Sequence, residues 1–308
     1  MKPFQKNVAL AIDGGGIRGV IVTKALSILE EALGHTIYDD TRLMAGTSTG
    51  SIIAAELATG ISAEKLHKLY LDFGEEIFKK SWRTFFWPFT RYRYSHEPLE
   101  EALRMYLSER VMSDYWNANP PTDVIITTYD LLANRPRFIK SWKSEYGDWP
   151  AVKAVLASSS APTYFPVVDG QYVDGGLGAY ANPCYLAAYE ILFVLKWKLE
   201  ETTLISLGTG RDPNAVNAGE PDRFHAWDWL DPVFDAFLAS ASDQQVHLVK
   251  TLFDGLDFRR FQVDLKESIE MDDASAIPEL VKYGEAMGQM ILNDQYDWAQ
   301  LVNPPDLP

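Results

Sequence analysis

The chain has 308 residues, of which 47% are hydrophobic and 23% are charged, a balance typical of a globular protein that buries a core. Its 28 Lys and Arg residues against 43 Asp and Glu residues give a formal net charge of −15. This charge argues against nucleic acid as a partner, because that binding depends on basic side chains that neutralise phosphates. The single cysteine, Cys184, excludes an intrachain disulfide and a cysteine metal site.

The sequence predicts neither a leader peptide nor a membrane span. The apolar run at 8–12 is too short for the core of a signal peptide. The longest apolar stretch, 184–197, is interrupted by Glu190 and is shorter than the ~20 residues that a spanning helix needs. We expect a cytoplasmic protein that meets membranes only at their surface, with secretion without a cleavable signal as the open alternative.

Strand-like runs alternate with helical patterns along most of the chain. The apolar patterns predict strands at 8–12, 43–45, 123–130, 137–142, 172–174 and 203–210, and helices at 21–33, 49–59, 185–196 and 277–292. This alternation predicts an α/β fold with three α/β/α layers and a mostly parallel central sheet. We expect a single domain over 1–308, with the motifs in a core at 8–210 and a helical C-terminal part at 211–308.

A glycine-rich loop follows the first predicted strand, in the stretch VALAIDGGGIRG at 8–19. Its glycines fit the G-x-G-x-x-G spacing that binds the pyrophosphate of a dinucleotide after a strand. That interpretation also needs an acidic residue at the end of a second strand, whereas Asp39 and Asp40 precede the next strand. Asp13, directly before the glycines, would also repel a pyrophosphate. We therefore expect the loop to bind another anion and no dinucleotide.

The sequence GTSTG at 46–50 fits the pattern G-x-S-x-G, with Ser48 in the centre and Gly46 and Gly50 on either side. A predicted strand precedes it and a predicted helix follows it, which is the context of a nucleophile elbow. The start of the helix offers amides and a positive dipole end to an oxyanion. Taken alone, the pattern is equally consistent with a serine that caps a helix.

A serine nucleophile needs a base, and two kinds of base are available. His35, His67 and His96 come before the region where a late histidine base is expected, and His225 and His247 lack a small-residue loop that would expose an imidazole. Asp174, in YVDGGLG at 172–178, ends a predicted strand before two glycines. Partial burial would raise its pKa toward that of a useful base, although alone the pattern also fits an ordinary Asp-Gly turn.

Four motifs in one order resemble the patatin-like phospholipase family. They are DGGGIRG, GTSTG, ASSSAPTYFP at 157–166 and the DGG that begins at Asp174, and LISLGTG at 204–210 also matches a family strand. The resemblance implies a patatin-like fold, Ser48 as nucleophile, Asp174 as its base, and no histidine, metal or cofactor. It also implies that amides around Gly14, Gly15 and Gly16 bind the oxyanion. Arg18 would add positive charge near the oxyanion or a lipid phosphate, with orientation of the loop through carbonyl contacts as an equal alternative.

The resemblance further implies a lipid acyl hydrolase that cleaves esters of phospholipids, lysophospholipids or acylglycerols. Two alternatives stay open at this point. One is a lipid-binding or storage protein of the same fold whose Ser48 and Asp174 are catalytically idle. The other is a serine esterase assisted by His225 or His247.

The segment 78–95 differs from the acidic background of the chain. It contains five basic residues, no acidic residue and eight aromatic residues. Such a mixture suits a lipid–water interface, where rings lie at headgroup level and cations meet phosphates. We expect it to form a loop or lid that docks a lipid substrate or a membrane surface, with a folded cap packed on the core as the alternative.

Overall fold

A computed structural model describes residues 1–297 except 88, 214–215, 217–218 and 227. Within these residues seven strands form one sheet, in the order β4-β3-β2-β1-β6-β7 with β5 also paired to β3. The strands are β1 Asn7–Ile12, β2 Thr41–Gly46, β3 Asp123–Asp130, β4 Arg135–Lys140, β5 Tyr172–Asp174, β6 Thr202–Leu207 and β7 Asp257–Phe261.

The sheet is mostly parallel, as predicted. β1, β2, β3, β6 and β7 run in one direction, and only β4 and β5 are antiparallel to their neighbour β3. The inner strands read as continuous apolar runs because both of their faces are covered. The predicted strands at 8–12, 43–45, 123–130, 137–142, 172–174 and 203–210 correspond to β1 to β6.

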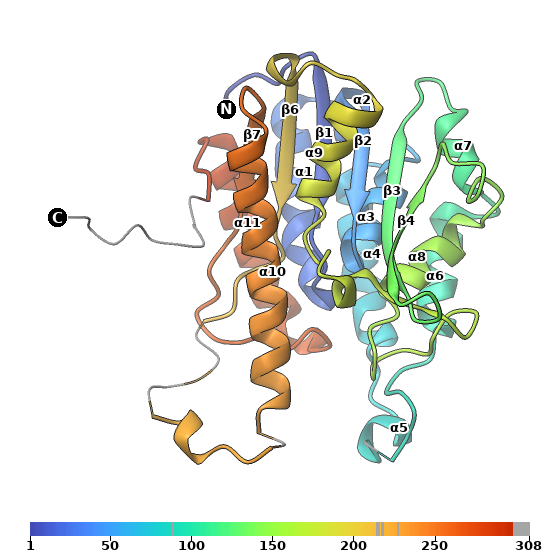
Figure 1. Cartoon of the computed structure of the whole chain (residues 1–308), viewed down its shortest axis with the longest axis vertical. Coiled ribbons are helices and arrows are strands. Elements are labelled where there is room, and N and C mark those ends of the chain that lie inside the picture. Colours follow the sequence, from blue (N-terminus) through green and yellow to red (C-terminus); the bar gives the residue numbers. More distant parts are fainter. Residues whose placement is uncertain (88, 214–215, 217–218, 227, 298–308) are drawn as a thin grey trace.

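Helices cover both faces of the sheet and make three layers (Figure 1). One face packs against α1 Gly19–Leu33, α3 Thr49–Leu57, α4 Ala63–Ile77, α6 Glu97–Leu107, α7 Met112–Trp116, α8 Ala151–Ser159 and α11 Ile277–Leu292. The other face packs against α9 Cys184–Tyr189 and α10 Leu230–Leu252. Two one-turn helices complete the set, α2 Ile37–Asp40 and α5 Trp82–Phe85.

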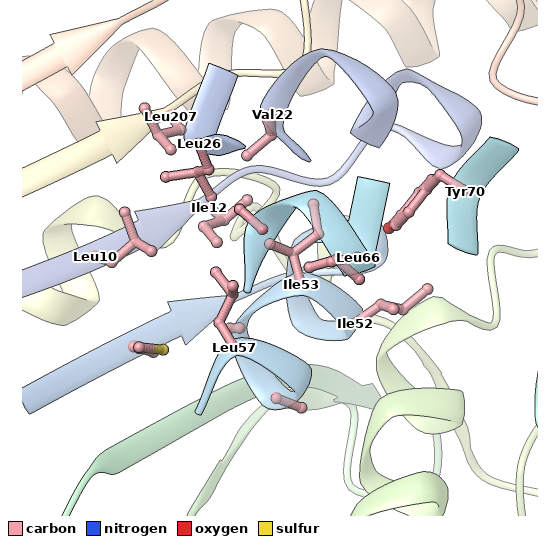
Figure 2. Packing of buried hydrophobic residues seen from close by; sticks show 14 of the residues in the cluster. Leu10, Ile12, Val22, Leu26, Ile52, Ile53, Leu57, Leu66, Tyr70 and Leu207 are labelled. Atoms are coloured by element: carbon pink, nitrogen blue, oxygen red, sulfur yellow. The ribbon is translucent and has the colours of Figure 1, made fainter. Parts of the chain in front are cut away.

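Helix α3 lies in the centre of the larger layer, and every one of its residues is buried. A helix that is surrounded on all sides needs mostly apolar residues, and α3 has them at every position but Thr49, Ser51 and Glu56 and its glycine. Figure 2 shows Ile53 of α3 beside Ile12 of β1 and Leu66 of α4. This packing fixes the start of α3, and therefore Ser48, against the carboxyl ends of β1 and β2.

The predicted helices at 21–33, 49–59 and 277–292 are confirmed as α1, α3 and α11. The helix predicted at 185–196 begins as α9 and continues as a wider π-helical turn at Glu190–Val194. The prediction that 211–308 is helical is wrong for β7, which adds a strand to the edge of the sheet beside β6. Its sequence, DFRRF, carries three charged residues in five and lacks the apolar run that marked the other strands.

Strand β7 carries a buried ion pair to the end of β1. Arg260 donates to both carboxylate oxygens of Asp13, at 2.9 and 2.6 Å, and to the Ser206 hydroxyl of β6 at 2.9 Å. Burial raises the pKa of Asp13, and the adjacent guanidinium of Arg260 opposes that rise. The pair connects the C-terminal part of the chain to the residue that precedes the glycine loop.

We predict that Arg260→Met destabilises the fold by about 3–5 kcal/mol, because it leaves the Asp13 carboxylate buried without its partner. The double variant Asp13→Leu/Arg260→Met should recover most of that loss, since it removes both charges together. Urea unfolding followed by circular dichroism measures both variants. Equal stability of wild type and Arg260→Met would contradict the anchoring role of the pair.

Candidate active site

Ser48 lies on a tight turn between β2 and α3. Its backbone has φ 53° and ψ −126°, a conformation that costs a non-glycine residue energy and is typical of functional positions. The turn brings backbone segments into contact, since a Cβ on Gly46 would lie 2.1 Å from the Gly50 carbonyl oxygen, and one on Gly50 would lie 2.2 Å from that of Ile12. The strand–turn–helix context expected for a nucleophile elbow is therefore present, and the need for both flanking glycines is steric.

Asp174 ends β5, where β5 pairs with Thr128 of β3. Its carboxylate accepts a hydrogen bond from the Gly176 amide at 2.8 Å and lies within reach of the Ser48 hydroxyl. The residue is only 6% exposed. Burial raises the pKa of Asp174 to about 6, and the interactions with Ser48 and the Gly176 amide limit the rise. The structure thus brings Ser48 and Asp174 together, and the carboxylate is a stronger base than an exposed aspartate.

The glycine loop packs directly on Ser48, with a Cβ on Gly14 expected 3.1 Å from the Ser48 Cβ. Contrary to expectation, the Gly14 amide is not available to an oxyanion, because it donates to the Ala181 carbonyl at 2.8 Å. In the part of the chain that the structure describes, the amides of Gly15 and Gly16 make no main-chain hydrogen bond. Gly16, at φ 58°, lines the same pocket as Ser48.

Arg18 forms an ion pair with Asp212, which also accepts hydrogen bonds from the Ser268 hydroxyl and the Ile269 amide. Its charge is thus compensated inside the protein, and Arg18 ties the glycine loop to the segment 268–271. The Ile17 amide strengthens this tie by donating to the Met271 carbonyl at 2.9 Å. This geometry fits the alternative in which Arg18 orients the loop. The contact is made with the Asp212 carboxylate and not with the backbone carbonyls that this alternative assumed.

Asp13 also does not act as expected, which was to repel an anion in the glycine loop. Its carboxylate is bound to Arg260, so it does not present a free negative charge to an anion in the loop. The repulsion argument against a dinucleotide therefore fails. The argument from the second strand holds, because Asp39 and Asp40 end α2 and precede β2.

The run of serines at the end of α8 contributes two positioning contacts that sequence reasoning missed. The Ser158 hydroxyl accepts a hydrogen bond from the Ser48 amide at 2.9 Å, and the Ser160 carbonyl accepts one from the Asp174 amide at 3.1 Å. Ser158 and Ser160 therefore connect the two reactive residues. The only available signal was the repetition of serine between the two motifs, which does not reveal its partners.

The two histidines considered as alternative bases lie elsewhere. His225 and His247 are exposed, and no contact among the described residues connects either side chain to Ser48 or Asp174. His96, set aside for its early position, is nearer to the site: its Nε2 lies 3.0 Å from the Ser160 hydroxyl and its ring stacks on Phe165. Burial lowers the pKa of His96, which favours the neutral imidazole.

An apolar pocket opens beside Ser48. It extends between α4 and α6, and its polar lining is confined to the region of the nucleophile. The apolar residues that line it are Ile17, Ile52, Leu69, Tyr70, Ile77, Phe78, Leu99, Ala102, Leu103 and Phe165. A pocket with this lining suits an apolar group whose reactive end lies at Ser48.

The described residues provide neither a metal-ligand cluster nor a membrane-spanning helix. No three or more His, Cys, Asp or Glu side chains are grouped as a metal site would require. No helix combines the length and the apolar character needed to cross a bilayer.

Residues 10–188 match the family model described as patatin-like phospholipase. The chain is 30% identical to patatin-like protein 1 of Oryza sativa subsp. indica, with 78% of this chain and 69% of that protein covered. It is 27% identical to the cGAMP-activated phospholipase of Vibrio cholerae, with 77% and 74% covered, and 29% identical to that of Escherichia coli, with 65% and 61% covered. Among solved structures, VipD from Legionella pneumophila is similar at a TM-score of 0.49 and 12% identity, over 95% of this chain and 67% of that one.

The raised pKa of Asp174 predicts the pH dependence of ester cleavage. Asp174 accepts a proton only when ionised, so kcat/KM should rise with pH and level off above an apparent pKa of about 6. The measurement is a pH–rate profile on a soluble short-chain ester, with circular dichroism at each pH to confirm folding. An acid limb near ~4, where an exposed aspartate titrates, would contradict the effect of burial.

Proposed function

The chain belongs to the patatin-like phospholipase family, and from this premise we propose that it cleaves lipid acyl esters through Ser48 and Asp174. The observation that carries the proposal is the proximity of Ser48, which lines an apolar pocket, to the buried carboxylate of Asp174. The family makes the protein a serine hydrolase of lipid acyl groups. The residues and the steps described next are our proposal.

In the proposed reaction, Asp174 takes the Ser48 proton as the serine oxygen attacks the ester carbonyl. The carbonyl oxygen becomes an oxyanion that the Gly15 and Gly16 amides stabilise, each such donor contributing about 3 kcal/mol. The intermediate collapses to an acyl-serine, and the alcohol leaves with the proton held by Asp174. Water then loses a proton to Asp174 and attacks the acyl-serine, which releases the fatty acid and restores Ser48.

We assign the apolar pocket to the acyl chain. Its lining between α4 and α6 offers apolar contact but no charged side chain, whereas a headgroup needs polar partners. Ser48, Gly16 and Ser159 lie at the polar end, where the ester would be cleaved. This arrangement favours substrates with one long chain inserted and the alcohol portion directed outward.

The segment 78–95 supplies the proposed contact with a lipid surface. Its ends pack on the core, because Phe78 lines the pocket and Tyr94 is buried, with its hydroxyl donating to Asp272 at 2.8 Å. Its middle contains α5 and is open, with Phe85 82% and Phe89 92% exposed. The cap and docking interpretations thus apply to different parts of one segment, within which position 88 lies outside the described residues.

We predict that Ser48→Ala and Asp174→Asn each reduce p-nitrophenyl ester hydrolysis by about 1,000-fold or more, because each removes one of two groups that act as a unit. His225→Asn and His247→Asn are the matched controls and should retain activity. Loss of activity in either histidine variant would favour the histidine-assisted esterase. A folded wild type that is inactive on every ester would favour the idle lipid-binding alternative.

Ala102 is buried in the pocket wall and tests where the chain lies. Ala102→Leu should move the chain-length optimum toward shorter esters, because the larger side chain occupies part of the pocket. The kinetics of p-nitrophenyl esters of graded length measure this shift, and kcat/KM for the acetate ester serves as the internal control. An unchanged optimum in a folded variant would contradict the assignment of the pocket to the acyl chain.

A further inference from the structure

The first half of α10 exposes a stripe of large apolar side chains. Trp229, directly before the helix, and Val233 and Phe237 within it are 44%, 57% and 42% exposed. Their spacing of four residues places them along one face of the helix. The other half of α10 packs normally, with Val246 and Val249, and Phe253 directly after the helix, in the core. Trp229 meets one ring, that of Phe224 at 5.2 Å, whereas Val233 and Phe237 belong to neither core cluster of the described residues.

The stripe lies beside the catalytic loop. Leu238, the residue that follows Phe237, approaches Gly176, since a Cβ on Gly176 would lie 3.6 Å from the Leu238 Cδ2. Gly176 is the residue whose amide donates to the Asp174 carboxylate. The helix thus extends outward from the reactive centre.

The start of α10 and the α5 helix project from the same end of the molecule, beyond the carboxyl ends of the strands (Figure 1). They lie on opposite sides of that end. The segment around α5 (the α5 segment, within 78–95) also exposes large rings, those of Trp82, Phe85, Phe86 and Phe89. Ser48 follows the carboxyl end of β2 and therefore faces the same end. Exposed apolar patches of this extent mark contact sites on otherwise soluble domains.

We propose that the α10 stripe, Trp229, Val233 and Phe237, is a second contact with the lipid surface and works together with the α5 segment. This inference rests on the proposed function, which makes lipid the substrate. With both projections in the interface, the mouth of the pocket faces the lipid. Rings at headgroup depth suit both projections, because aromatic side chains partition to the membrane–water boundary.

The charges of the two projections specify the kind of surface. The segment 78–95 carries Lys79, Lys80 and Arg83, which suit lipid phosphates, whereas the exposed Asp228 precedes the α10 stripe. A strongly anionic surface would attract the first and repel the second. A zwitterionic phospholipid surface accommodates both, and we commit to that occupant.

The test compares Val233→Glu/Phe237→Glu with Leu252→Glu, a control at the far end of the same helix where Leu252 is 57% exposed. Binding to phosphatidylcholine vesicles is measured by co-sedimentation in a Ser48→Ala background, so that no lipid is consumed. Hydrolysis is measured on the same vesicles and on a soluble short-chain ester. The double variant should lose about tenfold or more in vesicle binding, since binding scales with inserted apolar area, and Leu252→Glu should lose none.

The ratio of vesicle to soluble-ester activity should fall about tenfold in the double variant, as vesicle binding does. Unchanged vesicle binding, or equal loss on both substrates, overturns the proposal. A wild-type dimer in sedimentation velocity that becomes a monomer in the double variant also overturns it, because the stripe would then contact a second copy of the chain. Absence of ester hydrolysis in wild type would instead reject the proposed function, and the binding comparison in the Ser48→Ala background would still decide the role of the stripe.

Discussion

In the proposed mechanism, burial of the Asp174 carboxylate is what would allow the site to work without a histidine. An exposed aspartate has a pKa of ~3.9 and holds a proton too weakly to draw one from a serine hydroxyl. Removal from water raises the pKa of Asp174 to about 6, which brings it within range of general base catalysis at neutral pH. The surrounding architecture maintains that burial, with β3 alongside, the Ser160 carbonyl on the Asp174 amide and the Gly176 amide on the carboxylate.

A second buried aspartate near the site, Asp13, shows why one buried carboxylate is an anchor and the other a proposed base. Asp13 and Asp174 are both removed from water, and burial raises the pKa of each. Arg260 binds both oxygens of Asp13 and compensates its charge, so that carboxylate serves as an anchor between β1 and β7. Asp174 accepts a hydrogen bond from the Gly176 amide and has the Ser48 hydroxyl nearby, and neither group carries a charge that would cancel its basicity. Among the described residues, a cation lies beside the Asp13 carboxylate and none lies beside the Asp174 carboxylate. This difference explains why we assign a structural role to the first and a catalytic role to the second.

The sequence predicted the parts of this protein that depend on local pattern. Apolar runs identified β1 to β6, and four ordered motifs identified Ser48 and Asp174 as a pair that the structure brings together. The errors arise from contacts between distant segments. Gly14 was expected to bind an oxyanion because nothing local reveals that its amide donates to Ala181. Strand β7 escaped prediction because Arg259 and Arg260 are charged, and only their ion pairs allow them to be buried.

The chain that connects α4 to α6 forms both the proposed lipid contact and part of the pocket wall. These two helices form the walls of the pocket, and the chain that joins them is the segment 78–95. Phe78 and Tyr94 at its two ends contact each other at 5.5 Å between ring centres, and both pack against Phe165 in the pocket region. In the proposed function, contact with lipid and entry of an acyl chain would therefore involve one segment whose two ends pack beside the nucleophile.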